Sequence, residues 1–147
     1  MRIYLDTSAL SRIFDDQSQP RIYLEATAIL IVFMLIEFRN IEMVSSDILS
    51  FENDKNPYND RKTFVNSILK NANETQTIDD KILMRSQEIE GLNIKGLDAL
   101  HLACAERLRV DYFITCDDRI MKNYKGSIKV KNPVDFVAGI LQKEENK

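Results

Sequence analysis

The chain has 147 residues, of which 44% are hydrophobic and 29% are charged, with only 4 glycines and 3 prolines. This composition is typical of a soluble globular protein and excludes collagen-like and disordered chains, and the length suits a single domain spanning residues 1–147. Because 20 Lys and Arg face 23 Asp and Glu, the net charge is −3. This charge argues against a protein that wraps nucleic acid through bulk positive charge, but it is compatible with a nuclease that contacts a few phosphates.

Cysteine content and hydrophobic patterning narrow the expected setting. Two cysteines, Cys104 and Cys116, are too few for a disulfide framework. The longest apolar run, residues 28–36, is too short to cross a bilayer, which takes about 20 residues. The first residues carry no apolar signal segment. We therefore expect a reduced, cytoplasmic setting and no membrane span.

Short β-prone runs alternate with helical stretches along the chain. In chain order, the pattern predicts a strand at 2–5, a helix at 21–38, a strand at 41–44, helices at 46–52 and 60–72, a strand at 75–78, helices at 80–92 and 97–109, strands at 112–116 and 128–131, and a last helix from Pro133. Strands that alternate with helices indicate an α/β fold, a three-layer α/β/α sandwich with a central parallel sheet of about five strands.

The helix at 21–38 is apolar on almost every face. Such a helix is either buried in the core or lies in a subunit contact. A homodimer contact and core burial are equal alternatives on the sequence alone.

Acidic residues stand where several predicted elements begin or end. Asp6 ends the first strand, Glu52 lies in the helix after the second, Asp98 opens a helix after Gly96, and Asp117 and Asp118 follow the fourth strand. Ligands of open parallel sheets bind at the carboxyl ends of the strands, near the point where strand order reverses. We therefore expect these carboxylates to meet at one edge of the sheet.

Gathered carboxylates repel one another. Two of them 4 Å apart cost about 4 kcal/mol at an effective dielectric near 20, so either some are protonated or a divalent cation holds them. Oxygen ligands alone favour Mg²⁺ or Mn²⁺, and one histidine with two cysteines twelve residues apart offers no zinc pattern. Mg²⁺ on carboxylates commonly assists phosphate chemistry.

Structural roles compete with this interpretation. Asp98 could be only a helix N-cap, and Asp117 or Asp118 could cap the following helix. His101 lies three residues after Asp98 on the same helix face, where a hydrogen-bonded structural histidine is favoured over a His–Asp dyad. Thr115 could orient an aspartate or serve as a hydroxyl ligand.

Four stretches in this order resemble the PIN domain family, and more narrowly its VapC-like toxin ribonucleases and their cyanobacterial relatives. They are LDTSAL at 5–10, Glu52, LDALHLACA at 97–105 and ITCD at 114–117. The resemblance spans nearly the whole chain, although the match at Glu52 depends on a single residue.

The resemblance implies a Mg²⁺- or Mn²⁺-dependent endoribonuclease, with an antitoxin as a possible partner. Asp6, Glu52, Asp98 and Asp117 would be the catalytic, metal-binding carboxylates, with Ser8 and Thr115 as supporting residues. Asp118 falls outside this acidic set and would bind metal through water or play no catalytic part. The segment around Asp15, Asp16 and Gln17 looks like a subgroup signature without an evident physical role, although the nearby Arg21 could meet a phosphate.

Substrate binding requires cations, and the stretch 119–131 carries five of them without an acid. Arg119, Lys122 and Lys125 follow Asp117 closely and could guide an RNA backbone. A solvated basic surface is the equal alternative.

Two other classes of protein share some of these features. A receiver-like signalling domain would use Asp79 as phosphoacceptor and Lys131 as its lysine, but Asp6 lacks an acidic neighbour; a haloacid-dehalogenase-type phosphatase would need Asp in place of Ser8. A PIN module that binds RNA or protein without cleaving is the other alternative.

Overall fold

The fold is an α/β sandwich around a parallel sheet. The computed structural model describes residues 1–38 and 41–145. Among them, five strands form one sheet in the order β3-β2-β1-β4-β5, with every neighbouring pair parallel. The strands are β1 (Arg2–Leu5), β2 (Glu42–Ser46), β3 (Thr75–Gln76), β4 (Tyr112–Ile114) and β5 (Lys129–Lys131). The predicted fold class is confirmed.

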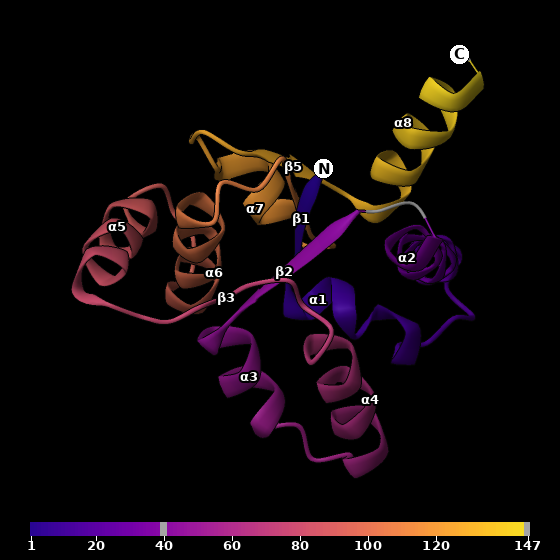
Figure 1. Cartoon of the computed structure of the whole chain (residues 1–147), viewed down its shortest axis with the longest axis horizontal. Coiled ribbons are helices and arrows are strands. Elements are labelled where there is room, and N and C mark those ends of the chain that lie inside the picture. Colours follow the sequence, from indigo (N-terminus) through magenta and orange to yellow (C-terminus); the bar gives the residue numbers. More distant parts are fainter. Residues whose placement is uncertain (39–40, 146–147) are drawn as a thin grey trace.

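Helices cover both faces of the sheet (Figure 1). They are α1 (Thr7–Leu10), the short 3-10 helix η1 (Arg12–Phe14), α2 (Pro20–Phe38), α3 (Asp47–Asp54), α4 (Asn59–Leu69), α5 (Asp80–Glu90), α6 (Gly96–Arg107), α7 (Asp118–Asn123) and α8 (Pro133–Glu145). The packed pair α5 and α6 lies on one side of the sheet, and the packed pair α2 and α8 lies on the other. The helical pair α3 and α4 extends below one end of β2 in this view.

The order of strands places a switch point beside β1. From β1 the chain builds outward to β2 and β3, and then returns to place β4 on the opposite side of β1. The backbone N–H of Asp6 donates to the carbonyl of Ile114 at 3.2 Å, which continues this pairing past the last residue of β1. The carboxyl ends of β1 and β4 therefore flank the crevice where ligands of open parallel sheets bind.

This topology overturns the receiver-like alternative. A receiver sheet has the order 2-1-3-4-5, which places its third strand beside the first. Here β3 lies at the edge of the sheet, two strands away from β1. Asp79 caps α5 by accepting from the N–H of Ile82, and it also pairs with Arg107. It is a capping residue remote from the strand-end crevice.

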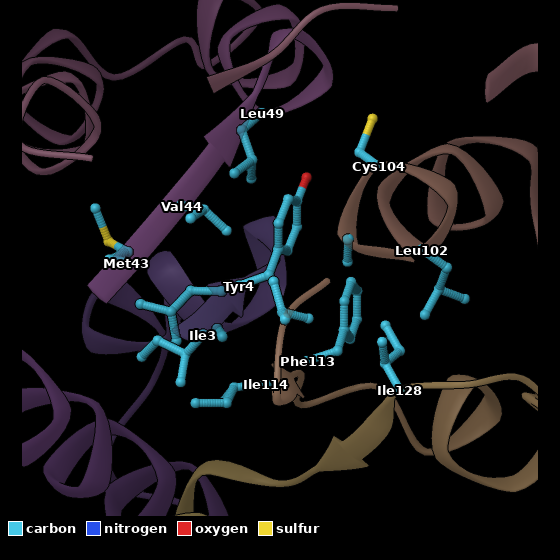
Figure 2. Close-up of a cluster of buried hydrophobic side chains, with 14 of the residues drawn as sticks. Ile3, Tyr4, Met43, Val44, Leu49, Leu102, Cys104, Phe113, Ile114 and Ile128 are labelled. Carbon is cyan, nitrogen blue, oxygen red and sulfur yellow. The ribbon is translucent and has the colours of Figure 1, made fainter. Parts of the chain in front are cut away.

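The core is built on the central strands. Ile3, Tyr4 and Leu5 are all buried, as expected for a strand covered by helices on both faces. Figure 2 shows the Tyr4 ring among these apolar side chains, with its hydroxyl directed away from Ile3. The ring stacks on Phe113 of β4 with centroids 5.3 Å apart, an arrangement worth about 1 kcal/mol beyond the buried area.

Element boundaries differ from the prediction by a few residues. β2 runs two residues further than predicted, to Ser46, whose side chain then caps α3 by accepting from Leu49 N–H. α8 continues to Glu145; residues 146 and 147 lie outside the described residues.

α2 is buried on one face and exposed to solvent on another. Ala28, Ile29 and Val32 are buried against the rest of the protein. On the other side of the helix, Leu24, Leu30 and Met34 each expose more than half of their surface. One face of α2 therefore belongs to the core, and an apolar face lies open. Among the described residues, no helix is both long enough and apolar enough to cross a membrane.

Candidate active site

Asp6 lies at the end of β1 and is almost completely buried. Its side chain caps α1 by accepting from the N–H of Ala9 at 3.0 Å. Burial raises the pKa of Asp6, and hydrogen bonds from Thr115 and Ser8 oppose that shift. The strand end thus holds a carboxylate in a fixed orientation inside the protein.

Ser8 and Thr115 fasten this carboxylate to the end of β4. Ser8 Oγ donates to Asp6 Oδ1 at 2.7 Å and accepts from the N–H of Cys116 at 3.1 Å. Thr115 Oγ1 donates to Asp6 Oδ2 at 2.5 Å and accepts from the N–H of Asp117 at 3.0 Å. Each hydroxyl therefore links Asp6 to the segment that carries Asp117.

Asp98 stands in the first turn of α6 without capping it. The cap of α6 is Lys95, which makes no side-chain cap bond, so the N-cap interpretation of Asp98 is wrong. Burial raises the pKa of Asp98 to about 6, and the negative charges of Asp6 and Asp117 add to the shift. These three carboxylates from distant segments are therefore close enough to repel one another.

The two acids after β4 have different surroundings. Asp117 caps α7 by accepting from the N–H of Arg119 at 2.8 Å. Asp118 forms a two-pronged pair with Arg21 of α2, at 2.8 and 2.7 Å, and this pairing lowers the pKa of Asp118. Arg21 also contacts the buried Glu25. Arg21 is thus engaged by two carboxylates, and Asp118 faces it at the edge of the site.

Glu52 approaches the site from α3. Thr7 Oγ1 donates to Glu52 Oε1 at 3.1 Å, and His101 Nε2 contacts the same oxygen. Burial alone would raise the pKa of Glu52, but the bonds from His101 and Thr7 and the charge of Lys55 outweigh it and lower the pKa. Glu52 is therefore an ionised carboxylate beside Asp98, whose pKa it helps to raise.

His101 is a buried, hydrogen-bonded histidine, as the sequence favoured, and it also contacts Glu52 of the site. Its ring is buried between Glu52 and the hydroxyl of Tyr4, which lies 2.6 Å from Nδ1 and 2.6 Å from Ser46 Oγ. An ionised Glu52 can only accept, so Nε2 carries the proton, and in the neutral ring Nδ1 accepts from Tyr4. The result is a chain of hydrogen bonds that runs from the core to Glu52.

The disfavoured dyad interpretation paired His101 with Asp98, because the two lie one helical turn apart. The structure pairs it with Glu52, 49 residues away in sequence. The only sequence signal was a histidine inside an apolar helix, which indicates a buried hydrogen-bonded ring but does not identify its partner.

The four acids lack cationic partners of the usual kind. In the part of the chain that the structure describes, no Lys or Arg forms an ion pair with Asp6, Glu52, Asp98 or Asp117. Across residues 1–38 and 41–145, no three His, Cys, Asp or Glu side chains form a closed metal-binding cluster as they stand. The donor set is nevertheless all oxygen and its charges are uncompensated, which fits a hard divalent cation.

A pocket opens beside two of these acids. It has a volume of about 760 Å³ and lies between α5 and the start of α6, with Glu52, Asp98, Leu83, Gln87 and Leu97 among its lining residues. A substrate that reaches the carboxylates therefore has a partly apolar space next to them.

The three basic residues predicted to bind substrate are exposed on and after α7. Arg119, Lys122 and Lys125 are all exposed to solvent, and within the described residues none of them forms an ion pair. They follow Asp117 directly along the chain. Their position is compatible with contact to a polyanion.

The comparisons with known proteins agree with this geometry. The PIN domain family model matches residues 3–126, and the chain belongs to the PIN domain family. No curated protein sequence matches it.

Solved structures share the fold at low sequence identity. A chain of VapBC2 from Rickettsia felis, solved bound to a promoter DNA fragment, is 15% identical with a TM-score of 0.59, over 90% of this chain and 98% of that one. VapBC-1 from nontypeable Haemophilus influenzae is 17% identical with a TM-score of 0.55, covering 90% and 98%. FitAcB from Neisseria gonorrhoeae is 17% identical with a TM-score of 0.53, covering 89% and 97%.

Proposed function

We propose that the protein is a divalent-metal-dependent endoribonuclease that hydrolyses phosphodiester bonds of RNA. The observation that carries this proposal is the meeting of four acids at the switch point of the sheet with no Lys or Arg paired to them in the described residues. Membership of the PIN domain family supports nuclease chemistry.

Asp6, Glu52, Asp98 and Asp117 are the residues that would hold Mg²⁺ or Mn²⁺. When bound, the ion would lower the pKa of water and offset negative charge on the attacked phosphate. Asp98 accepts no hydrogen bond from the described residues, so its carboxylate is the one available to take a proton from the attacking water.

The neighbouring side chains orient these acids. Ser8 and Thr115 occupy both oxygens of Asp6 and prevent its rotation. His101, itself held by Tyr4, contacts Oε1 of Glu52 and fixes its direction. Partners of this kind tune a metal-binding group by fixing its direction.

RNA would reach the site over the exposed cations that follow Asp117. Charge reversal at Lys122 and Lys125 should weaken RNA binding and flatten its dependence on salt concentration, because fewer counterions would be released. Unchanged affinity in the double variant would remove these lysines from the proposal.

The central test is cleavage of a mixed RNA pool in Mn²⁺ by the wild type, Asp6→Asn and Asp98→Asn. We expect both substitutions to reduce cleavage at least 100-fold, since each removes one carboxylate charge. Undiminished cutting by both variants would defeat the proposal. A wild type that binds RNA but never cuts it, at any Mg²⁺ or Mn²⁺ concentration, would establish the non-catalytic PIN alternative.

Partners follow from the neighbours and from α2. The similar structures are VapBC-type complexes, which supports a toxin role with a small antitoxin as partner. The open apolar face of α2 at Leu24, Leu30 and Met34 suits a homodimer contact. Light scattering should give twice the chain mass for the wild type and the monomer mass for Leu30→Lys; a monomeric wild type would contradict the dimer.

A further inference from the structure

Exposed aromatic rings and cations alternate where α3 leads into α4. We define the α3–α4 corner as Phe51, Lys55, Tyr58 and Arg61. Phe51 is 46% exposed and Tyr58 is 55% exposed. Lys55 Nζ lies 4.1 Å from the centroid of the Phe51 ring, and Arg61 Cζ lies 4.2 Å from that of Tyr58. Each ring thus carries a cation over one face while about half of the residue stays open to solvent.

Cation–ring contacts are concentrated at this corner. Phe14, which packs edge-on against Phe64, places its ring 5.5 Å from Arg61 and gives that cation a second aromatic neighbour. Cation–ring contacts occur about once per 70 to 80 residues in proteins. Of the four found within residues 1–38 and 41–145, three lie at this corner.

The corner adjoins the acidic site. Phe51 immediately precedes Glu52 in α3. Lys55 follows Glu52 by one helical turn, and its backbone N–H donates to the carbonyl of Glu52 at 3.2 Å. α3 also packs against α6, the helix that carries Asp98. A strand of RNA cut at the carboxylates would therefore continue directly onto these rings.

We propose that the α3–α4 corner binds unpaired bases of the RNA beside the cleaved bond, by stacking them on Phe51 and Tyr58 while Lys55 and Arg61 meet the adjacent phosphates. This inference rests on the proposed function, because it takes RNA as the substrate. Aromatic faces accept every base, and neighbouring cations follow the backbone, so such a surface selects single-stranded RNA without selecting sequence.

The basic stretch after Asp117 provides no equivalent surface. Its cations are exposed, but Tyr124 is buried, and Lys129 lies 5.8 Å from the centroid of Tyr112. That stretch can attract phosphates of either single or double strands. The α3–α4 corner is therefore the surface that would select unpaired RNA over duplex RNA.

The test measures binding of a fluorescent single-stranded 12-mer and of its duplex by anisotropy, in EDTA so that no cleavage occurs. We expect Phe51→Ala and Tyr58→Ala each to weaken binding of the single strand about 10-fold, because one stacked base is lost, and to leave the duplex unaffected. Phe51→Trp should restore single-strand affinity. Arg61→Gln should reduce the salt dependence by about one counterion.

Met84→Ala is the matched control, since Met84 is 65% exposed on α5, away from the corner. The proposal is overturned if both alanine variants bind the single strand within twofold of the wild type. This holds even if the same variants lose binding to a protein partner. A wild type that does not bind the single strand would overturn it as well. The cleavage assay in Mn²⁺ is separate: a wild type that binds through the corner but cuts nothing refutes the nuclease, whereas one that cuts while the alanine variants bind normally refutes the corner.

Discussion

The two ends of β1 differ in whether the acidic residues there pair with cationic side chains. At the amino end, Arg2 pairs with Glu42 at 3.2 Å and Glu74 at 2.7 Å, and its backbone N–H donates to Asp111 at 2.8 Å. At the carboxyl end, Asp6, like Asp98 and Asp117, pairs with no Lys or Arg in the described residues. Compensated acids at one end join strands, and uncompensated acids at the other repel one another.

Glu25 shows that this protein can compensate even a buried acid. It is almost fully buried in α2, and Arg12, Arg21 and Asn132 all contact its carboxylate. The carboxylate of Asp6 is equally buried but meets only hydroxyls and a backbone N–H. Repulsion left in place at one edge, when the chain neutralises acids elsewhere, indicates a group arranged for a ligand rather than for stability.

The largest expected effect compares the two ends of β1 directly. Asp117→Asn should lower RNA cleavage in Mn²⁺ at least 100-fold, since the site would lose one of the carboxylates that hold the divalent cation. Glu42→Gln, at the compensated end, should leave the rate within twofold, because an exposed ion pair contributes about 1 kcal/mol or less to stability. Equal losses in both variants would abolish the distinction between the ends.

The compensated interior acid should matter for stability. Glu25→Ala leaves Arg12 and Asn132 without their buried partner, so we expect the free energy of unfolding to fall by about 2 to 3 kcal/mol, discounted because Arg21 is half exposed. Urea denaturation measures this change. Asp118→Ala, which removes only the exposed pair with Arg21, is the control and should change the free energy of unfolding much less than Glu25→Ala. A neutral Glu25→Ala would show that this cluster contributes nothing to folding.

Substitutions of His101 test whether Glu52, the acid that it contacts, needs a fixed direction. His101→Ala should raise the Mn²⁺ concentration required for half-maximal cleavage about 10-fold, as expected when a positioning partner is lost. His101→Gln, which can still donate to Glu52, should recover part of that loss. If both variants show the wild-type metal dependence and differ only in thermal stability, the histidine has a purely structural role.

The smallest effect concerns the stability of the protein without metal. Burial and the charges of Asp6 and Asp117 raise the pKa of Asp98 to about 6, so the folded chain binds more protons than the unfolded one below that pH. Stability should therefore fall as pH rises from about 4 to about 6. The free energy of unfolding of Asp98→Asn should then be about 1 kcal/mol higher than that of the wild type at pH 7.5, after allowance for solvent screening.

This advantage should disappear at about pH 4, where the wild-type carboxyl is protonated as well. Added Mg²⁺ should also shrink it, because the ion would stabilise only the wild type. A variant that is less stable than the wild type at pH 7.5 would contradict repulsion at Asp98.

Local signals in the sequence were sufficient for the fold class and for the position of most acids. Alternating strand and helix patterns predicted the parallel sheet, and Asp6 and Asp117 could be placed at strand ends because each directly follows a β-prone run. Ser46 and Asp79, which stand directly before α3 and α5, cap these helices. These features depend on residues within a turn or two of each other, so they can be predicted from a short stretch of sequence.

Only the tertiary structure decided which side chains became partners. His101 contacts Glu52 and not Asp98, and Asp118 forms an ion pair with Arg21. One face of α2 is buried while another is exposed to solvent. The atoms in these pairs are 49 and 97 residues apart in sequence. Their meeting depends on strand order and helix orientation, which are set by the packing of the whole core and not by the residues beside them.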